Sequence, residues 1–389
     1  MDEFLREQES TFGLSFAVDI YDRDDLFEPI DNPRVVELSR LGGRPGFAGP
    51  ENVLKSTGIS TRRILREGRT AVDLALALCQ RLQQESGLPL QDFSAVMLCH
   101  SHANPVVCEQ VADALCMHLS LPSETVTAFN FGCSGFLKLL HEAVLHMTSD
   151  ESVTRIALLN IETPETWHDA SDRLFCGIVS AGATALVLER GRGMSISAVL
   201  SDDFPIPEHL RPNPEPLFHR ETTDVFSFRG RAEQRTVMRM NAEPVFLNGI
   251  ELMLTNLRTA ASSIDVLPGQ RVIVVPHQPS GKLLRALIAA ARAEFPAFEF
   301  LNNLRVYGNT ISSSVPTILS RFSEVLAANG NMPMREGDHI ILLAAGICME
   351  KIADHMSAGH ACLQWVSQTK STAPAFERDL TRLRPAISE

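Results

Sequence analysis

The stretch Val126-Thr-Ala-Phe-Asn-Phe-Gly-Cys-Ser-Gly-Phe-Leu-Lys-Leu-Leu-His141 changes its residue pattern part-way along. It begins as a short run of strand-forming residues, turns at Phe131-Gly132, and continues with apolar residues at helical spacing. Cys133 therefore lies where a strand ends and a helix begins. The unpaired N–H groups and the positive dipole end of a helix favour a thiolate there. The alternative is a small core residue at a tight turn, since free cysteines are mostly buried.

Length and composition are those of a globular protein large enough for two domains or one two-lobed body. The 389 residues are 44% hydrophobic and 21% charged, and no apolar run reaches the length of a transmembrane helix. The acidic first residues lack the basic region and apolar core of a secretory signal, so we expect a cytoplasmic protein with no membrane association. The formal charge of −12 argues against nucleic acid as the main partner.

The cysteines and histidines do not predict a metal site. There is no C-x-x-C pair and no zinc-type spacing, and His100, His102 and His168 do not have the spacing of metal ligands. Several cysteines lie in apolar runs, so we expect reduced thiols rather than disulfides. The eight cysteines are at positions 79, 99, 108, 116, 133, 176, 348 and 362.

Continuous apolar runs alternate with helical patterns along most of the chain. Residues 94–99, 154–161 and 183–188 have the pattern of strands that are buried on both faces. Helical periodicity covers 70–84 and 107–119, and the same alternation resumes after residue 241. This order predicts an α/β layered fold.

The composition divides the chain into five parts. Residues 1–52 are interpreted as an N-terminal extension with little regular structure, and 351–389 as a surface tail. Residues 53–198 and 242–350 are the two halves of the fold. Between them, residues 199–241 are rich in proline, arginine and charge, which predicts an excursion over the surface or over an active-site mouth.

The two halves repeat one pattern. Ser101 and His277 each follow an apolar strand and are 176 residues apart, and Cys133 and Asn309 are also 176 residues apart. Cys133 and Asn309 each follow an aromatic-Gly pair at a turn from strand into helix. The next strands, 156–159 and 340–343, keep the same order with eight extra residues in the second copy. Matches in this order predict a duplicated βαβαβ unit with pseudo-two-fold symmetry.

The symmetry brings three reactive side chains to equivalent places. Cys133, His277 and Asn309 are all expected at the carboxyl ends of strands, where open α/β sheets form their active sites. A thiolate can take an acyl group while helix-terminal N–H groups hold the oxyanion. The imidazole and the amide can then donate hydrogen bonds to a second thioester carbonyl. The sequence therefore predicts an acyl-transfer site.

At this point the chain resembles the thiolase superfamily, and specifically the 3-oxoacyl-acyl-carrier-protein synthase III group, over about residues 53–350. The nucleophile motif is Gly132-Cys-Ser-Gly-Phe-Leu137 and the histidine motif is Pro276-His-Gln-Pro-Ser280. The asparagine motif is Tyr307-Gly-Asn-Thr-Ile-Ser-Ser-Ser-Val-Pro316, and a T-G-I-x-x-R-x-I segment is present at 57–64.

The resemblance implies a homodimer of five-layered αβαβα subunits and ping-pong chemistry. Cys133 would accept an acyl group, and a malonyl-type or 3-oxoacyl thioester would then condense with it. His277 and Asn309 would stabilise the enolate left by decarboxylation. The substrates would be acyl-coenzyme A or acyl-carrier-protein thioesters, with no permanently bound cofactor.

The departures from the family pattern lie around the pocket. The family's F-G-D-G-A-G segment reads Val179-Ser-Ala-Gly-Ala-Thr184 here, and its triple glycine appears as Gly346-Ile-Cys348. We expect Gly346 and Cys348 at the oxyanion site or pocket wall. The tryptophan and arginine that clamp coenzyme A before the T-G-I segment are absent. With the long extensions and the excursion, these departures favour a condensing enzyme of specialised metabolism or of a fatty-acid-like pathway.

Basic residues suggest how a carrier protein would dock. Lys282 matches the family's docking position, and Arg285 follows it by one helical turn; the alternative is a solvated helix face. The arginines between 229 and 239 would meet substrate phosphates or an acidic carrier protein, or else form a solvated loop.

Two other functions stay open on sequence alone. In the first, Cys133 passes its acyl group to an oxygen or nitrogen nucleophile without forming a carbon–carbon bond. In the second, the chain is a non-catalytic partner of an active paralogue. The amide of Asn309 favours condensation over simple transfer, and an intact Cys-His-Asn set disfavours the inactive subunit.

Overall fold

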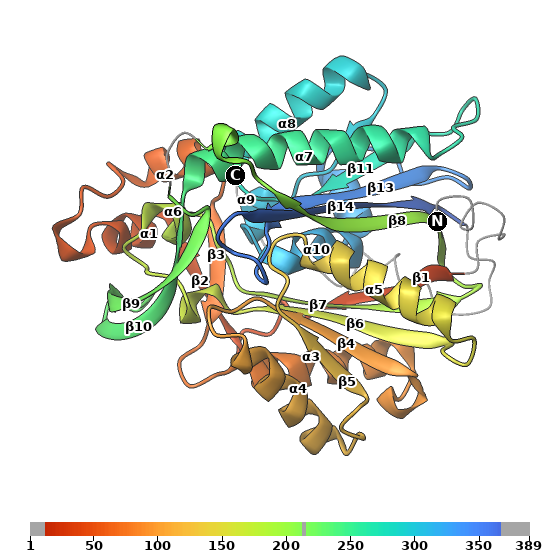
Figure 1. Cartoon of the computed structure of the whole chain (residues 1–389), viewed down its shortest axis with the longest axis horizontal. Helices are drawn as coiled ribbons and strands as arrows, with labels where there is room; N and C mark the ends of the chain where they lie inside the picture. Colours follow the sequence, from red (N-terminus) through yellow and green to blue (C-terminus); the bar gives the residue numbers. More distant parts are fainter. Residues whose placement is uncertain (1–11, 212–214, 367–389) are drawn as a thin grey trace.

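The computed structural model describes residues 12–211 and 215–366 and shows α/β layers around one mixed sheet (Figure 1). Ten strands follow the order β12-β11-β13-β14-β8-β1-β7-β6-β4-β5. None of the helices described is long and apolar enough to cross a bilayer.

The sheet consists of two halves with the same topology. In the first half β4 pairs in parallel with β5 and β6, and β7 is antiparallel to β6 and β1. In the second half β11 pairs in parallel with β12 and β13, and β14 is antiparallel to β13 and β8. β1 and β8 join the halves through two residue pairs. The predicted duplication is therefore confirmed.

The strands of the first half are β1 (Phe12–Asp19), β4 (Ala95–His100), β5 (Val126–Phe129), β6 (Arg155–Glu162) and β7 (Gly182–Arg190). Those of the second half are β8 (Met194–Pro205), β11 (Val272–Pro276), β12 (Glu299–Phe300), β13 (His339–Ile347) and β14 (His355–Gln364). Two separate two-stranded sheets pair β2 (Phe27–Asp31) with β3 (Thr61–Leu65), and β9 (Phe218–Phe226) with β10 (Ala232–Met240).

Helices cover both halves and also fill the space between them (Figure 1). α3 (Ala71–Ser86) and α4 (Val106–Leu119) form one outer layer, and α7 (Ala242–Ser262) and α8 (Gly281–Glu294) form the other. α5 (Gly135–Ser149) and α10 (Ser314–Ser320) lie in the middle. The shorter helices are α1 (Asn32–Ser39), α2 (Pro50–Thr57), α6 (Arg173–Cys176), α9 (Leu304–Tyr307) and α11 (Phe322–Ala328).

The alternation of side chains along β13 shows why the layers form. Ile340 and Leu342 pack into the central core with α5 and α10, whereas Ile341 and Leu343 pack with α7 and α8 on the other face. A strand with period-two geometry that is apolar at every position has to be covered on both faces. The duplicated sheet can do this only as a stack of alternating helical and sheet layers.

The structure corrects two expected boundaries. β1 lies in the middle of the sheet between β7 and β8, so residues 12–52 are not an irregular extension. β14 pairs along its whole length with β13 and β8, so residues 355–364 belong to the core rather than to a tail. Residues 1–11 and 367–389 of the two predicted extensions lie outside the described residues.

A buried ion pair fixes β1 to the end of α10. Arg321 donates two hydrogen bonds to Asp19, at 2.7 and 2.9 Å, and Ser320 Oγ donates a third at 2.8 Å. The Asp19 side chain is fully buried and that of Arg321 is 11% exposed. Removing one partner would leave the other charge buried without its counter-ion.

We therefore expect Arg321→Met to lower the free energy of unfolding by about 3–5 kcal/mol, measured by urea denaturation. The matched control is Arg258→Met, which breaks the exposed pair with Glu294 and is expected to cost no more than about 1 kcal/mol. Equal losses in the two variants would contradict the structural role of the buried pair.

Candidate active site

The three predicted catalytic residues line one cavity of about 540 Å³. Cys133, His277 and Asn309 reach it from β5–α5, β11 and the segment before α10. Gly346 lines the same cavity from β13, and Lys282 lines it from α8. The two halves of the fold thus supply one shared site.

Close backbone packing determines the position of Cys133. Gly132 has a φ of +81°, and a Cβ on it would lie 2.7 Å from the carbonyl oxygen of Ile347. A Cβ on Gly346 would lie 2.3 Å from the Cβ of Cys133. The backbone of β13 therefore lies directly against the cysteine, and no side chain fits between them.

Cys133 has the features of an accessible nucleophile. It is the one partly exposed cysteine of the eight, all of which are described. Its backbone N–H donates to no described residue, so this N–H can donate to an oxyanion that forms at the cysteine. The geometry allows an acyl group to be held on the sulfur next to a free donor.

The thiol is the resting form of Cys133. Burial and, to a smaller extent, the nearby carboxyl of Glu162 raise its pKa to about 12. The expectation of a thiolate stabilised by the helix dipole is therefore wrong: desolvation outweighs the helix end. α5 begins only at Gly135, two residues after the cysteine.

His277 is neutral and has two unused ring nitrogens. Its backbone N–H donates to Leu343 O at 2.6 Å, which extends the pairing of β11 with β13. Both ring nitrogens are buried without a partner, and burial lowers the pKa of the imidazole to about 3. A neutral imidazole offers one N–H donor and one lone pair to a bound substrate.

Asn309 is held so that its amide nitrogen remains available. Its Oδ1 accepts from Ile311 N at 2.9 Å, and its Nδ2 donates to Pro279 O at 3.3 Å. The second hydrogen on Nδ2 is left for a ligand. The turn at Asn309 does not lead from a strand directly into a helix as the repeat predicted. The short helix α9 precedes it, a 3₁₀ turn follows it, and α10 starts at Ser314.

Comparison with known proteins gives the site its context. Residues 265–351 match the family described as 3-oxoacyl-[acyl-carrier-protein] synthase III, C-terminal. The β-ketoacyl-[acyl-carrier-protein] synthase III of Cereibacter sphaeroides is 26% identical over 79% of this chain and 88% of its own length. That of Brucella suis is 27% identical over 76% and 87%.

Over most of its length this chain is similar to the 3-oxoacyl-[acyl-carrier-protein] synthase III proteins.

Solved structures share its fold. The synthase III from Aquifex aeolicus has a TM-score of 0.67 and 19% identity, covering 92% of this chain and all of that chain. The priming β-ketosynthase of the R1128 polyketide pathway has a TM-score of 0.67 and 16% identity over 92% and 97%. AbyA1, a tetronic acid condensing enzyme, has a TM-score of 0.63 and 14% identity over 90% and 99%.

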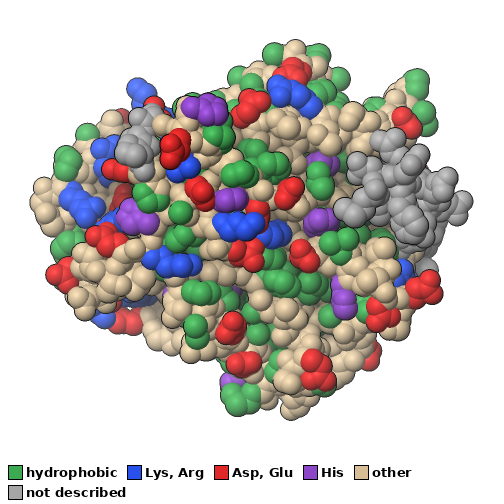
Figure 2. Space-filling model, in the orientation of Figure 1, with side chains coloured by type: hydrophobic (Ala, Val, Ile, Leu, Met, Phe, Trp, Pro, Cys, Tyr) green, Lys and Arg blue, Asp and Glu red, His purple; other side chains and the backbone are tan. Residues whose placement is uncertain are grey.

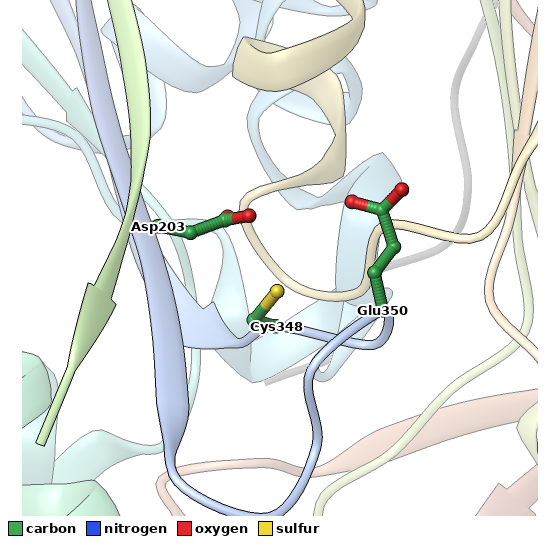
Figure 3. A group of neighbouring side chains, drawn as sticks. All are labelled: Asp203, Cys348 and Glu350. Carbon is green, nitrogen blue, oxygen red and sulfur yellow. The ribbon is translucent and has the colours of Figure 1, made fainter.

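Cys348 is not at the oxyanion site of this synthase III-like protein. It is absent from the cavity wall and lies beside Asp203 and Glu350 instead (Figure 3). Lys138 Nζ lies 3.2 Å from Asp203 and also pairs with Glu350, and Lys351 Nζ lies 3.5 Å from Asp203, so two ammonium groups offset the two carboxylates. The cluster is a salt-bridge network rather than a metal site.

The two predicted docking residues lie on the exposed face of α8. Lys282 is at the cavity, whereas Arg285 is exposed one turn further along and does not line it. On the face shown in Figure 2, acidic and basic side chains are interspersed. A docking role for these two residues remains a prediction.

The excursion predicted over 199–241 starts only after residue 205, because residues 199–205 belong to β8, and it forms part of the cavity wall. β9 and β10 form a hairpin, and Phe218 and Met240 at its base line the cavity. Trp167 and His168 also line it, and sequence reasoning gave neither a catalytic role. The only local signal for a pocket-lining role was that an aromatic ring and an imidazole stand next to each other shortly after a strand.

Gly346→Ala tests the close approach at Cys133. A methyl group 2.3 Å from the Cβ of Cys133 would displace the strand or the cysteine, so acylation of Cys133 is expected to slow by on the order of 10²-fold. Intact-protein mass spectrometry measures this rate. Gly49→Ala is the control, since its nearest neighbour would be 3.7 Å away.

The raised pKa of Cys133 predicts a steep pH dependence. At pH values below its pKa of about 12, Cys133 is mainly the neutral thiol, and its thiolate fraction rises with pH. The rate of alkylation by iodoacetamide should therefore increase about tenfold per pH unit between about pH 7 and pH 10. Cys133→Ala gives the background rate. A rate that levels off between about pH 9 and pH 10 would show an ordinary thiol.

Proposed function

We propose that this chain catalyses a ping-pong decarboxylative Claisen condensation between an acyl thioester and a malonyl-type or 3-oxoacyl thioester. The observation that carries the proposal is the convergence of Cys133, His277 and Asn309 on one cavity. The names of the relatives and of the condensing enzymes that share the fold support it.

Acylation of Cys133 is the first half-reaction. Its sulfur attacks the thioester carbonyl, the donor thiol leaves with a proton, and the acyl group remains on Cys133. The neutral His277 can accept the proton of the thiol, because it has a free lone pair in the same cavity. The Cys133 N–H stabilises the oxyanion of the tetrahedral intermediate.

Decarboxylation is the second step. The carboxylate of a malonyl thioester leaves as carbon dioxide, and its electron pair becomes an enolate on the thioester. An N–H of His277 and the free hydrogen of Asn309 Nδ2 donate to the enolate oxygen. Among the described lining residues, only Arg173 and Lys282 are cationic, and both are exposed. Thus no buried cation among these residues stabilises the malonyl carboxylate, which would oppose its loss as carbon dioxide.

Condensation completes the cycle. The enolate carbon attacks the acyl carbonyl on Cys133, the carbon–sulfur bond breaks, and the cysteine thiolate takes a proton from solvent. The product is a 3-oxoacyl thioester that is longer by the extender unit. The mainly apolar and aromatic wall of the cavity suits an uncharged acyl group.

Several finer assignments belong to the same proposal. Lys282 at the cavity and Arg285 beside it would meet an acidic carrier protein. The polyketide and tetronic acid enzymes that share the fold favour a specialised-metabolite pathway. The short edge strand β5 supports a homodimer, because an unpaired edge can pair with its copy.

Mass spectrometry and carbon dioxide release test the two half-reactions separately. Wild-type protein should gain the acyl mass from an acyl thioester, and Cys133→Ala should not. Cys176→Ala, which removes another buried thiol outside the cavity wall, should still gain it. No gain with any donor would refute the function.

Asn309→Ala should still be acylated but should release carbon dioxide from a malonyl thioester about 10²–10³-fold more slowly, because one oxyanion donor is lost. Undiminished release would contradict the role of the amide. Acylation without any release in the wild type would favour transfer to an oxygen or nitrogen nucleophile.

A further inference from the structure

A buried carboxyl group lies behind the catalytic residues. Glu162 is the last residue of β6, its side chain is fully buried, and it does not line the cavity. Burial raises its pKa to about 8, against the opposing effect of hydrogen bonds from Ser312 and Ser101. A carboxyl group is costly to bury, so its position calls for a physical reason.

One oxygen of Glu162 accepts three hydrogen bonds. Ser101 Oγ donates to Oε1 at 2.8 Å, Ser312 N donates at 3.2 Å, and Ser312 Oγ donates to the same atom. The other oxygen, Oε2, accepts only from Ser101 N, at 3.3 Å. Ser101 follows β4 in the first half of the fold, and Ser312 belongs to the second half. The carboxyl group thus ties the two halves together.

The segment that Glu162 holds is the one that orients Asn309. Ser312 directly follows Ile311, whose N–H holds Asn309 Oδ1 at 2.9 Å. Ile311 has a φ of +50°, an unfavourable conformation for a β-branched residue, so surrounding contacts have to maintain it. The hydrogen bonds from Ser312 to Glu162 are such contacts.

The same serine also contacts the helix that follows Cys133. A Cβ on Gly135 would lie 2.9 Å from Ser312 Cβ and 2.6 Å from Cys99 Sγ, so the first turn of α5 packs directly on Ser312. Glu162, Ser312 and Gly135 therefore fix the Asn309 segment relative to the Cys133 turn.

We propose that Glu162 is a positioning residue for decarboxylation: its Oε1 holds Ser312, which keeps the amide of Asn309 oriented toward the enolate next to the acylated Cys133. This inference rests on the function proposed above. It predicts that loss of Glu162 slows the decarboxylation step, which uses Asn309, and does not slow the acylation step, which does not use it.

Two substitutions separate hydrogen bonding from bulk and charge. Glu162→Gln keeps a carbonyl oxygen that can replace Oε1, and its amide nitrogen then replaces only Oε2. Glu162→Met keeps a similar volume but removes the acceptor. We expect Glu162→Met to slow carbon dioxide release from a malonyl thioester by on the order of 10²-fold. Glu162→Gln should stay within about tenfold of the wild type in carbon dioxide release. Neither variant should acylate Cys133 more slowly than the wild type, because losing the carboxylate lowers the pKa of Cys133.

Serine variants supply a matched comparison on one segment. Ser312→Ala removes a donor to Glu162 and should slow carbon dioxide release without slowing acylation. Ser314→Ala removes a buried hydroxyl that has no partner, and should change neither rate. Crystal structures of Glu162→Met and wild type would show whether the bond from Ile311 N to Asn309 Oδ1 is lost.

The outcomes distinguish the inference from the proposed function. Slower release with intact acylation in Glu162→Met supports the positioning role. Unchanged release, or an equal loss of both half-reactions in folded protein, overturns it. If wild type is acylated but releases no carbon dioxide, the proposed function fails. The crystal structures then decide the inference: an unmoved Asn309 amide in Glu162→Met overturns it, and a displaced amide supports it.

Discussion

The rest of the site depends on the contact between the β13 backbone and Cys133. A Cβ at position 346 would lie 2.3 Å from the Cβ of the cysteine, and a Cβ at 132 would lie 2.7 Å from the carbonyl oxygen of Ile347. Two glycines thus allow the second half of the fold to touch the nucleophile of the first. The duplicated topology makes this contact possible, since β5 before Cys133 and β12, which is followed by α9 and then Asn309, are the equivalent edge strands of the two halves. The site is therefore a property of the interface between the halves and of neither half alone.

The same burial that builds the cavity also sets the charge state of its residues. It raises the pKa of Cys133 and lowers that of His277, so both side chains are neutral at neutral pH. A resting thiolate–imidazolium pair, as in many cysteine enzymes, is therefore absent from this site. Hydrogen-bond donors are instead preorganised around places where negative charge develops only during reaction, first on the acyl oxyanion and then on the enolate. This arrangement suits a chemistry that forms two anions in succession.

The fold and most of the site could be predicted because their signals are local. Gly132 and Gly308 both adopt positive φ at turns, and the β4, β6 and β13 strands are continuous apolar runs. β14 could not be predicted this way, because Ser357, Ala358 and Gly359 are small residues that interrupt the apolar run of the strand, although they pair with β13 and β8. Cys348 was misplaced because one residue of strand register decides which face a side chain occupies.

The arginines of the excursion are used within the fold. Arg229 pairs with Glu28 at 2.7 Å and Arg231 with Glu67 at 2.7 Å, which anchor the β9–β10 hairpin to the β2–β3 sheet and the residues after it. Arg239 pairs with Asp169 at 3.3 Å. These pairs hold the hairpin over the cavity and leave its cations poorly placed to bind substrate phosphates. We expect recognition of an anionic thioester donor to fall on the cationic side chains that line the cavity among the described residues, Arg173 and Lys282. The excursion thus shapes the wall of the pocket but supplies none of these cations.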